Sequence, residues 1–203
     1  MLKSKRLPAE KRKKMILRAA IDVFSESNYR VAKVTDIAAR AGVTDPMIYK
    51  FYQSKKELFV EVLAITTRKS SEKFGIENFI QPDQLNCMED LKAALEKSLS
   101  AYLTSMKVYH KELKIFYRAI SEIDDPEVEE VIQGQYKRLA NKMELLFQRA
   151  IDLNLLSGRH DAKTIAWDIV GFFIQQNVLF LAGLYDHEQT MAYLSKKIQF
   201  WLS

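Results

Sequence analysis

The chain has 203 residues, enough for one or two small domains, and its 48% hydrophobic and 28% charged residues are ordinary for a soluble globular protein. The single cysteine, Cys87, excludes an internal disulfide and suits a reducing cytoplasm, and the lack of an 18-residue apolar run argues against a membrane span. Strands and hairpins need turns rich in glycine and proline, and the chain has only six glycines and four prolines, so we expect an all-α fold.

The net charge of +5 is unevenly distributed along the chain. Residues 1–60 contain 14 Lys and Arg against six Asp and Glu, whereas residues 61–203 contain 17 against 20. The excess of +8 in the N-terminal segment is typical of a surface that binds nucleic acid. A solvated basic face accounts for the charge alone equally well, and a membrane-surface or partner-binding module is the alternative function.

The first helix is expected to follow a basic tail at residues 1–8, with Pro8 in its first turn and its end near Ser27-Asn28. Its core-facing residues recur at helical spacing. They are Ile16, Ala19, Ala20, Val23 and Phe24.

Residues 33–58, KVTDIAARAGVTDPMIYKFYQSKKEL, predict two short helices joined by a tight turn, followed by the start of a third. Gly42 stands where a positive φ favours glycine. Thr44 is expected to cap the second helix, and Pro46 falls in its first turn, where a missing N–H costs little. This layout is a helix-turn-helix, a device that binds DNA.

The same segment resembles the signature of the tetracycline-repressor (TetR) family of transcriptional regulators. The matching residues are Ile37-Ala38, Ala41-Gly42-Val43-Thr44, Ile48-Tyr49, Phe51-Tyr52, Ser54-Lys55 and Glu57-Leu58. The resemblance is specific over the first quarter to third of the chain. It implies that the second motif helix is the recognition helix and that Tyr49 and Lys55 hold phosphates. Many members place Ser or Thr as a helix cap where Lys33 stands here, so the helix starts either there or two residues on, at Thr35.

The N-terminal turn of a recognition helix points into the major groove, which assigns roles to its residues. Asp45 accepts from cytosine N4 or only caps the helix, and Met47 touches a thymine methyl group. The residues expected to bind DNA are Lys33, Thr35, Thr44, Asp45, Pro46, Met47, Tyr49, Lys50 and Lys55.

A fourth helix is expected to begin near Ser54, with Glu57 completing a capping box. After a loop at residues 75–86, five further helices are predicted. Their ranges are 88–104, 108–122, 126–153, 160–182 and 188–202, with Asp125-Pro126-Glu127 marking a helix start and Ser157-Gly158 a helix stop. About nine helices thus form a DNA-binding domain at residues 9–69, with its motif at about 32–51, and a ligand-binding and dimerisation domain at residues 70–203.

The segment from Ile165 to Gly183 is apolar nearly all round, and such a helix must be buried on all sides. A dimer partner provides that burial, as the family resemblance implies, and a central core helix within one subunit is the alternative. The expected interface residues are Ile165, Ala166, Ile169, Phe173, Leu181, Tyr193 and Phe200.

Aromatic residues interrupted by polar ones fit a pocket for a small hydrophobic or amphipathic ligand, which the resemblance also implies. The expected pocket residues are Tyr102, Glu112, Phe116, Tyr136, Met143, Phe147, Trp167, Phe172 and Gln175. The polar run 175–177 fits the dimer interface equally well.

No motif for catalysis, a metal or a cofactor is found in the sequence. The three histidines, His110, His160 and His187, have no ligand-like spacing, and phosphate-binding glycine loops and nucleophile elbows are missing. We therefore expect a cytoplasmic homodimer that is not an enzyme and has no cofactor. It is expected to bind a double-stranded, pseudo-palindromic DNA operator, without membrane contact, and to be released from it by a small-molecule effector.

Overall fold

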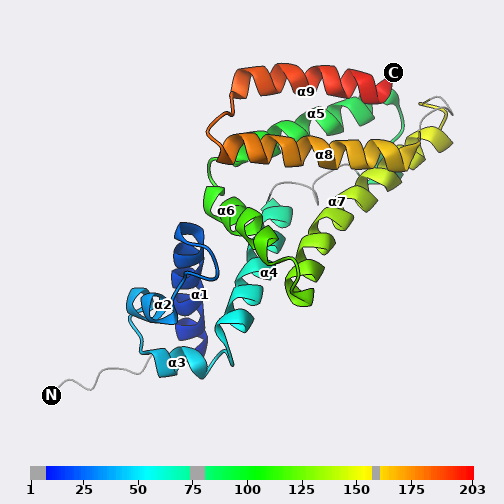
Figure 1. Cartoon of the computed structure of the whole chain (residues 1–203). Helices are drawn as coiled ribbons and strands as arrows, with labels where there is room; N and C mark the ends of the chain where they lie inside the picture. Colours follow the sequence, from blue (N-terminus) through cyan, green and yellow to red (C-terminus); the bar gives the residue numbers. More distant parts are fainter. Residues whose placement is uncertain (1–7, 74–80, 157–160) are drawn as a thin grey trace. The chain divides into compact units, whose positions relative to one another are not determined.

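The computed structural model describes residues 8–73, 81–156 and 161–203, with no account of the side chains of 69–73, and the described part is helical without strands (Figure 1). The expected all-α fold is confirmed. The helices are α1 Ala9–Glu26, α2 Val34–Ala41, α3 Asp45–Tyr49, α4 Lys55–Lys73, α5 Met88–Ser105, α6 His110–Ala119, α7 Pro126–Asp152, α8 Ala162–Leu181 and α9 His187–Leu202. Short 3-10 turns occupy Pro82–Gln84 and Ile120–Glu122. The expectations for residues 1–7, 75–80 and Ser157-Gly158 lie outside the described residues.

The chain divides into two compact units. The N-terminal unit contains Met1–Thr67 and Lys111–Val131, and the C-terminal unit contains Arg68–His110 and Ile132–Ser203. This grouping differs from a boundary near residue 70, because the segment around α6 joins the N-terminal unit. Helices α4 and α7 are each continuous and contribute residues to both units.

The helix ends explain where each element of the N-terminal unit begins. Lys33 occupies the N-cap of α2 in an extended conformation without a side-chain cap hydrogen bond, which places the start at Val34 rather than beyond Thr35. Thr44 occupies the N-cap of α3, but its hydroxyl makes no cap hydrogen bond, so the expected capping contact is wrong. The Ser54 cap of α4 is confirmed, because Ser54 Oγ accepts a hydrogen bond from the Glu57 amide at 3.1 Å.

The core of the N-terminal unit is built by apolar stripes of α1, α2 and α4. The predicted stripe of α1 is buried throughout, and Phe24 packs edge-on against Phe59 of α4 with ring centroids 5.0 Å apart. Tyr29, in the connection after α1, stacks on the same ring at 4.7 Å. Helices α1 and α2 are in extensive contact, which fixes the platform that carries α3.

The C-terminal unit combines α5, most of α7, α8 and α9 around an apolar core. Helix α8 has one buried side and one exposed side, rather than being buried all round. Its buried residues Ile165, Ala166, Ile169 and Phe173 belong to the core of the unit, so they are not available to a partner and their assignment to the dimer interface is corrected.

Candidate nucleic-acid interface

The turn between α2 and α3 fixes the angle at which α3 leaves the platform. Gly42 adopts a φ of +66°, in the left-handed region that residues with a Cβ rarely adopt. The Val43 amide donates to the Ala38 carbonyl at 3.0 Å, which satisfies the end of α2. Ile37 and Ile48 are buried on either side of the turn, so burial anchors both helices. The predicted helix-turn-helix is therefore present.

The opposite face of α3 carries the side chains expected to contact DNA. Pro46 lies in the first turn of this five-residue helix, as predicted, and is exposed. Tyr49 is 51% exposed and Lys50 is exposed, while Asp45 and Met47 are half-buried. These groups can donate to phosphates, accept from a base or touch a thymine methyl group.

Three more of the expected residues flank this face. Lys33 and Thr35, at the start of α2, and Thr44, at the start of α3, are all exposed. Helices α2 and α3 are in contact, so most of the expected DNA-binding residues lie on two packed helices of one unit.

Lys55 differs from the other expected DNA-binding residues because its ammonium is already occupied. Its Nζ lies 2.8 Å from the Tyr29 carbonyl oxygen, 3.1 Å from that of Ala32 and 3.4 Å from that of Arg30. It also lies 4.5 Å from the centre of the Tyr29 ring. An ammonium has three N–H donors, and each of them has a main-chain acceptor here.

The sequence reasoning missed Arg12 and Lys13, which connect the start of α1 to the neighbouring helices. Arg12 Nη1 lies 3.9 Å from Met47 Sδ on α3, and Lys13 Nζ lies 3.0 Å from Glu61 Oε1 on α4. Lys13 also lies 5.5 Å from the centre of the Tyr52 ring. The one signal in the sequence was that both cations lie close to the apolar stripe of α1, which indicates that they face neighbouring helices.

Polar side chains attach α6 to the end of α1 within the N-terminal unit. Lys111 Nζ lies 2.6 Å from Asp22 Oδ1, and the contact raises the pKa of Lys111. Arg118 Nη1 donates to the Ser25 carbonyl at 2.5 Å and the Phe24 carbonyl at 3.4 Å. A cation at the last carbonyls of a helix complements the negative end of its dipole.

The start of α7 is attached to α4 in the same unit. Lys56 Nζ lies 2.8 Å from both Asp125 Oδ2 and Glu127 Oε1, and these hydrogen bonds raise the pKa of Lys56. The hydrogen bond from Lys56 also lowers the pKa of Asp125, whose Oδ1 accepts from the Glu127 amide as the predicted cap of α7. Arg30 pairs with Glu122 at 2.9 Å, so residues 111–127 are tied to the DNA-binding helices.

The residues expected to line a ligand pocket fall into several environments. Glu112 and Phe116 belong to the N-terminal unit, and the other seven belong to the C-terminal unit. Of those seven, Met143, Phe147 and Phe172 are buried in the core, Tyr102 and Tyr136 are half-buried, and Trp167 and Gln175 are exposed. Trp167 and Gln175 therefore point away from the interior, which corrects their placement as internal pocket residues.

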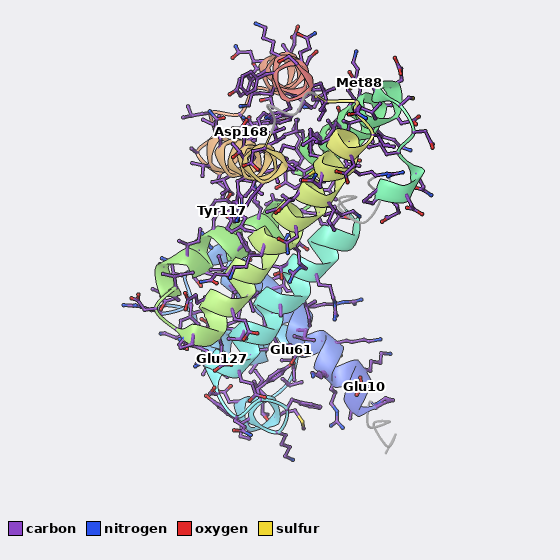
Figure 2. All side chains as sticks on the ribbon, turned by 90° about the vertical axis from the view of Figure 1, so that its right-hand side faces the viewer. Glu10, Glu61, Met88, Tyr117, Glu127 and Asp168 are labelled. Carbon is purple, nitrogen blue, oxygen red and sulfur yellow. The ribbon has the colours of Figure 1, made fainter. Side chains whose placement is uncertain are left out.

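Polar contacts made by Tyr102 and Asp168 stand among the apolar side chains of the C-terminal unit. The Tyr102 hydroxyl donates to Asn177 Oδ1 at 2.7 Å, and its ring packs edge-on against Phe173 at 4.3 Å. Asp168 lies on the side of α8 that faces α9 (Figure 2). Its Oδ2 accepts from Lys197 Nζ at 2.7 Å and Trp201 Nε1 at 2.6 Å.

Helix α8 is long and apolar enough to cross a membrane by length and composition, and 44% of its apolar stretch is buried. The core helix of a soluble protein has the same length and composition. Within the described residues it is the one such helix.

The helix-turn-helix, with its exposed polar face and basic surroundings, defines a DNA-binding transcriptional regulator. Residues 16–62 match the family described as bacterial regulatory proteins, tetR family, so this segment is similar to the DNA-binding part of that family.

Curated relatives agree with this assignment. The HTH-type transcriptional activator FasR of Mycolicibacterium smegmatis is 43% identical over 58 residues, which are 29% of this chain and 26% of FasR. The chain thus matches about a quarter of that relative. The HTH-type transcriptional regulator YdgC of Bacillus subtilis is 25% identical over 209 residues, covering 85% of this chain and 94% of YdgC.

Solved structures share the fold along nearly the whole chain. FadR from Bacillus subtilis, determined in complex with stearoyl-CoA, is 16% identical with a TM-score of 0.72, covering 94% of this chain and 98% of FadR. A regulator structure from Saccharomonospora viridis, determined with choline, is 16% identical with a TM-score of 0.76, covering 95% and 97% of the two chains. At this identity the likeness establishes the fold.

Proposed function

We propose that the protein is a cytoplasmic homodimeric repressor that binds a pseudo-palindromic operator through α2 and α3 and is released by a small amphipathic ligand. The exposed polar face of α3, held at a fixed angle by Gly42 and the buried Ile48, is the observation that carries the proposal. A two-fold symmetric protein binds two half-sites related by the same symmetry, which makes the operator pseudo-palindromic.

Roles within the interface follow from exposure and chemistry. We assign Thr44, Asp45, Pro46 and Met47, at the N-terminal end of the recognition helix, to base edges. The exposed Tyr49 and Lys50, with Lys33 and Thr35 on α2, are assigned to phosphates. Lys55 is reassigned to holding the connection between α1 and α2, because its three donors already have main-chain acceptors.

The proposed dimer surface lies on the outer side of α8 and α9. Exposed apolar residues lie on both helices, with Trp167 44% and Val178 48% exposed on α8, and Tyr193 40% and Phe200 67% exposed on α9. Gly171 is exposed on α8, and a Cβ built there meets nothing within 4 Å, so a neighbouring helix has room to approach closely. Large exposed apolar side chains on two neighbouring helices favour a partner, and a second copy satisfies the symmetry of the operator.

The proposed ligand lies among the apolar side chains of the C-terminal unit, with the Tyr102–Asn177 pair as a polar contact. The structural relatives named with stearoyl-CoA and with choline support small-molecule binding in this fold. An amphipathic molecule with a long apolar chain matches the aromatic and aliphatic surroundings of Tyr102 and Phe173.

Release requires that the ligand prefer the state that does not bind DNA. Helices α4 and α7 each run without interruption from one unit into the other, so repacking in the C-terminal unit can act on the DNA-binding helices through them. Half-site spacing is fixed by the DNA, and a helix shift on the order of 1–2 Å alters the spacing of the two recognition helices.

Selection of genomic fragments by the purified protein identifies the operator. Stearoyl-CoA is then titrated into the protein with and without that operator, with choline as the comparison compound. By linkage, the operator is expected to weaken stearoyl-CoA binding by the same factor by which stearoyl-CoA weakens operator binding. Equal ligand affinity in both titrations would rule out ligand-driven release, while leaving DNA binding itself intact.

A further inference from the structure

The guanidinium of Arg12 lies at the seam between α1 and the recognition helix. Arg12 is in the first turns of α1, and its Nη1 is 3.9 Å from the thioether sulfur of Met47 on α3. Figure 1 shows α3 lying across one end of α1, and this contact identifies that end as the N-terminal one. A cation thus sits directly against a residue that we assign to base contact.

The charge of Arg12 is poorly compensated in this position. Its Nε is buried and has no hydrogen-bond partner among the described residues. A guanidinium carries five N–H donors, and a thioether is only a weak, uncharged acceptor. The carboxylate of Glu61 is engaged by the next residue, Lys13, at 3.0 Å.

Arg12 as a whole is half-buried, so the buried and unpaired group is its Nε–H. A buried donor without an acceptor is destabilising, and natural proteins retain such groups mainly where function requires them. The acceptor that Nε lacks therefore lies outside the described residues, and an anionic oxygen that reaches the junction of α1 and α3 suits a guanidinium best. Phosphate meets these requirements, because guanidinium and phosphate form short, charge-assisted, bidentate hydrogen bonds.

We propose that Arg12 is a phosphate-binding residue of the DNA interface. Met47 holds its guanidinium in place until a phosphate oxygen of the DNA supplies the missing acceptor. The proposal rests on DNA binding through α3. It adds α1 to the elements that touch the operator, and it couples a phosphate contact to Met47.

The test is Arg12→Met, which keeps the side chain's bulk and removes its charge and donors. Binding to a fluorescein-labelled duplex of random sequence, about 30 base pairs long so that both protomers of a dimer can contact it, is measured by anisotropy between about 50 and 200 mM salt. The slope of log K against log salt is expected to fall by about two relative to wild type, because one phosphate contact is lost from each protomer of the dimer. The melting temperature is expected to stay the same or rise, since a poorly compensated cation has been removed.

Two further variants separate a site from a general charge effect. Arg18→Met removes the same charge from an exposed position farther along α1 and is expected to leave the slope close to that of wild type. Arg12→Lys keeps a cation and is expected to recover the wild-type slope, though not the full affinity, because ammonium cannot bind phosphate in a bidentate manner.

A wild-type slope for Arg12→Met would overturn the proposal while leaving DNA binding by α3 intact. Equal losses for Arg12→Met and Arg18→Met would also overturn it, as would a lower melting temperature combined with an unchanged slope, which indicates a structural role. Wild-type protein that does not bind the duplex would overturn the proposed function as well.

Discussion

The Nζ atom of Lys55 lies 2.8 Å from the main-chain oxygen of Tyr29. Lys55 is the first residue of α4, and Tyr29 lies in the connection between α1 and α2. The contact is one of three that the ammonium makes with carbonyl groups of this connection. It joins the first residue of α4 to the segment from which α2 begins. The contact therefore holds the start of the helix-turn-helix in place against α4.

Replacing Lys55 is therefore expected to destabilise the protein. Lys55→Met removes charged hydrogen bonds worth about 1.5–3 kcal/mol in unfolding free energy and leaves carbonyl groups unpaired. Urea unfolding followed by circular dichroism measures the change. Lys50→Met, at an exposed position, is expected to stay within about 0.5 kcal/mol of wild type and to lose DNA affinity instead. Full stability of Lys55→Met with weakened DNA binding would restore Lys55 as a phosphate anchor.

The identity of the base contacts is tested by Asp45→Ala. Asp45 is half-buried in the first turn of α3, where it is placed either to accept from cytosine or only to complement the helix dipole. Base contact predicts that the variant selects a different preferred sequence from a randomised duplex pool. Tyr49→Phe, which removes a phosphate donor, is the control and is expected to weaken all sequences about equally. An unchanged preference for Asp45→Ala leaves only the helix-capping role.

The proposed dimer surface is tested by Phe200→Glu. Phe200 is 67% exposed on α9, so a charge there is tolerated by a lone protomer but not by an apolar interface. Light scattering at micromolar concentration is expected to show a dimer for wild type and a folded monomer for the variant. Leu145→Glu is the matched control, because Leu145 is 62% exposed on α7, and it is expected to remain dimeric.

Ala166→Arg, on α8, is expected to unfold the protomer, whereas Phe200→Glu is expected to leave a folded monomer. Ala166 is fully buried, so an arginine there places an unpaired charge in the protomer core and is expected to unfold it, at a cost of roughly 3–5 kcal/mol. Loss of helicity by circular dichroism checks this. A helical, monomeric Ala166→Arg would place the residue at the interface after all.

The contact between Asp168 and α9 predicts a pH dependence of stability. Partial burial opposes the charged form of Asp168, but hydrogen bonds from Lys197 and Trp201 outweigh it and hold the pKa below the ordinary value of 3.8. Because the folded-state pKa is depressed, the stabilisation is complete above that ordinary value and is lost as the pH falls through the lower folded-state value.

Urea unfolding of wild type and Asp168→Asn measures this contribution. The difference in unfolding free energy between the two proteins is expected to shrink as the pH is lowered from neutral to below 3.8. A difference that stays constant over this range would show that the charge of Asp168 does not contribute.

The sequence predicted the helices well because their signals are local. Asp125-Pro126-Glu127 and Ser54-Lys55-Lys56-Glu57 contain caps that act within one turn, and α7 and α4 begin where these signals place them. Gly42 marked the motif turn because few other residues tolerate a positive φ.

The contacts between helices were not predictable in the same way. The sequence showed that α8 is apolar, but the burial of Ala166 and the exposure of Trp167 depend on which side packs against the rest of the core. The positions of Arg12 against Met47 and of Lys55 against Tyr29 depend on tertiary packing across 35 and 26 residues.

Binding to a symmetric operator is the central claim, and one competition measurement tests it most directly. The selected operator is compared with a copy in which one half-site is scrambled and with a copy whose half-sites are separated by about five extra base pairs, half a helical turn. Both altered duplexes are expected to lose most of the specific affinity, because two recognition helices on one dimer must meet two half-sites on the same face of the DNA. Equal affinity for all three duplexes would contradict the account.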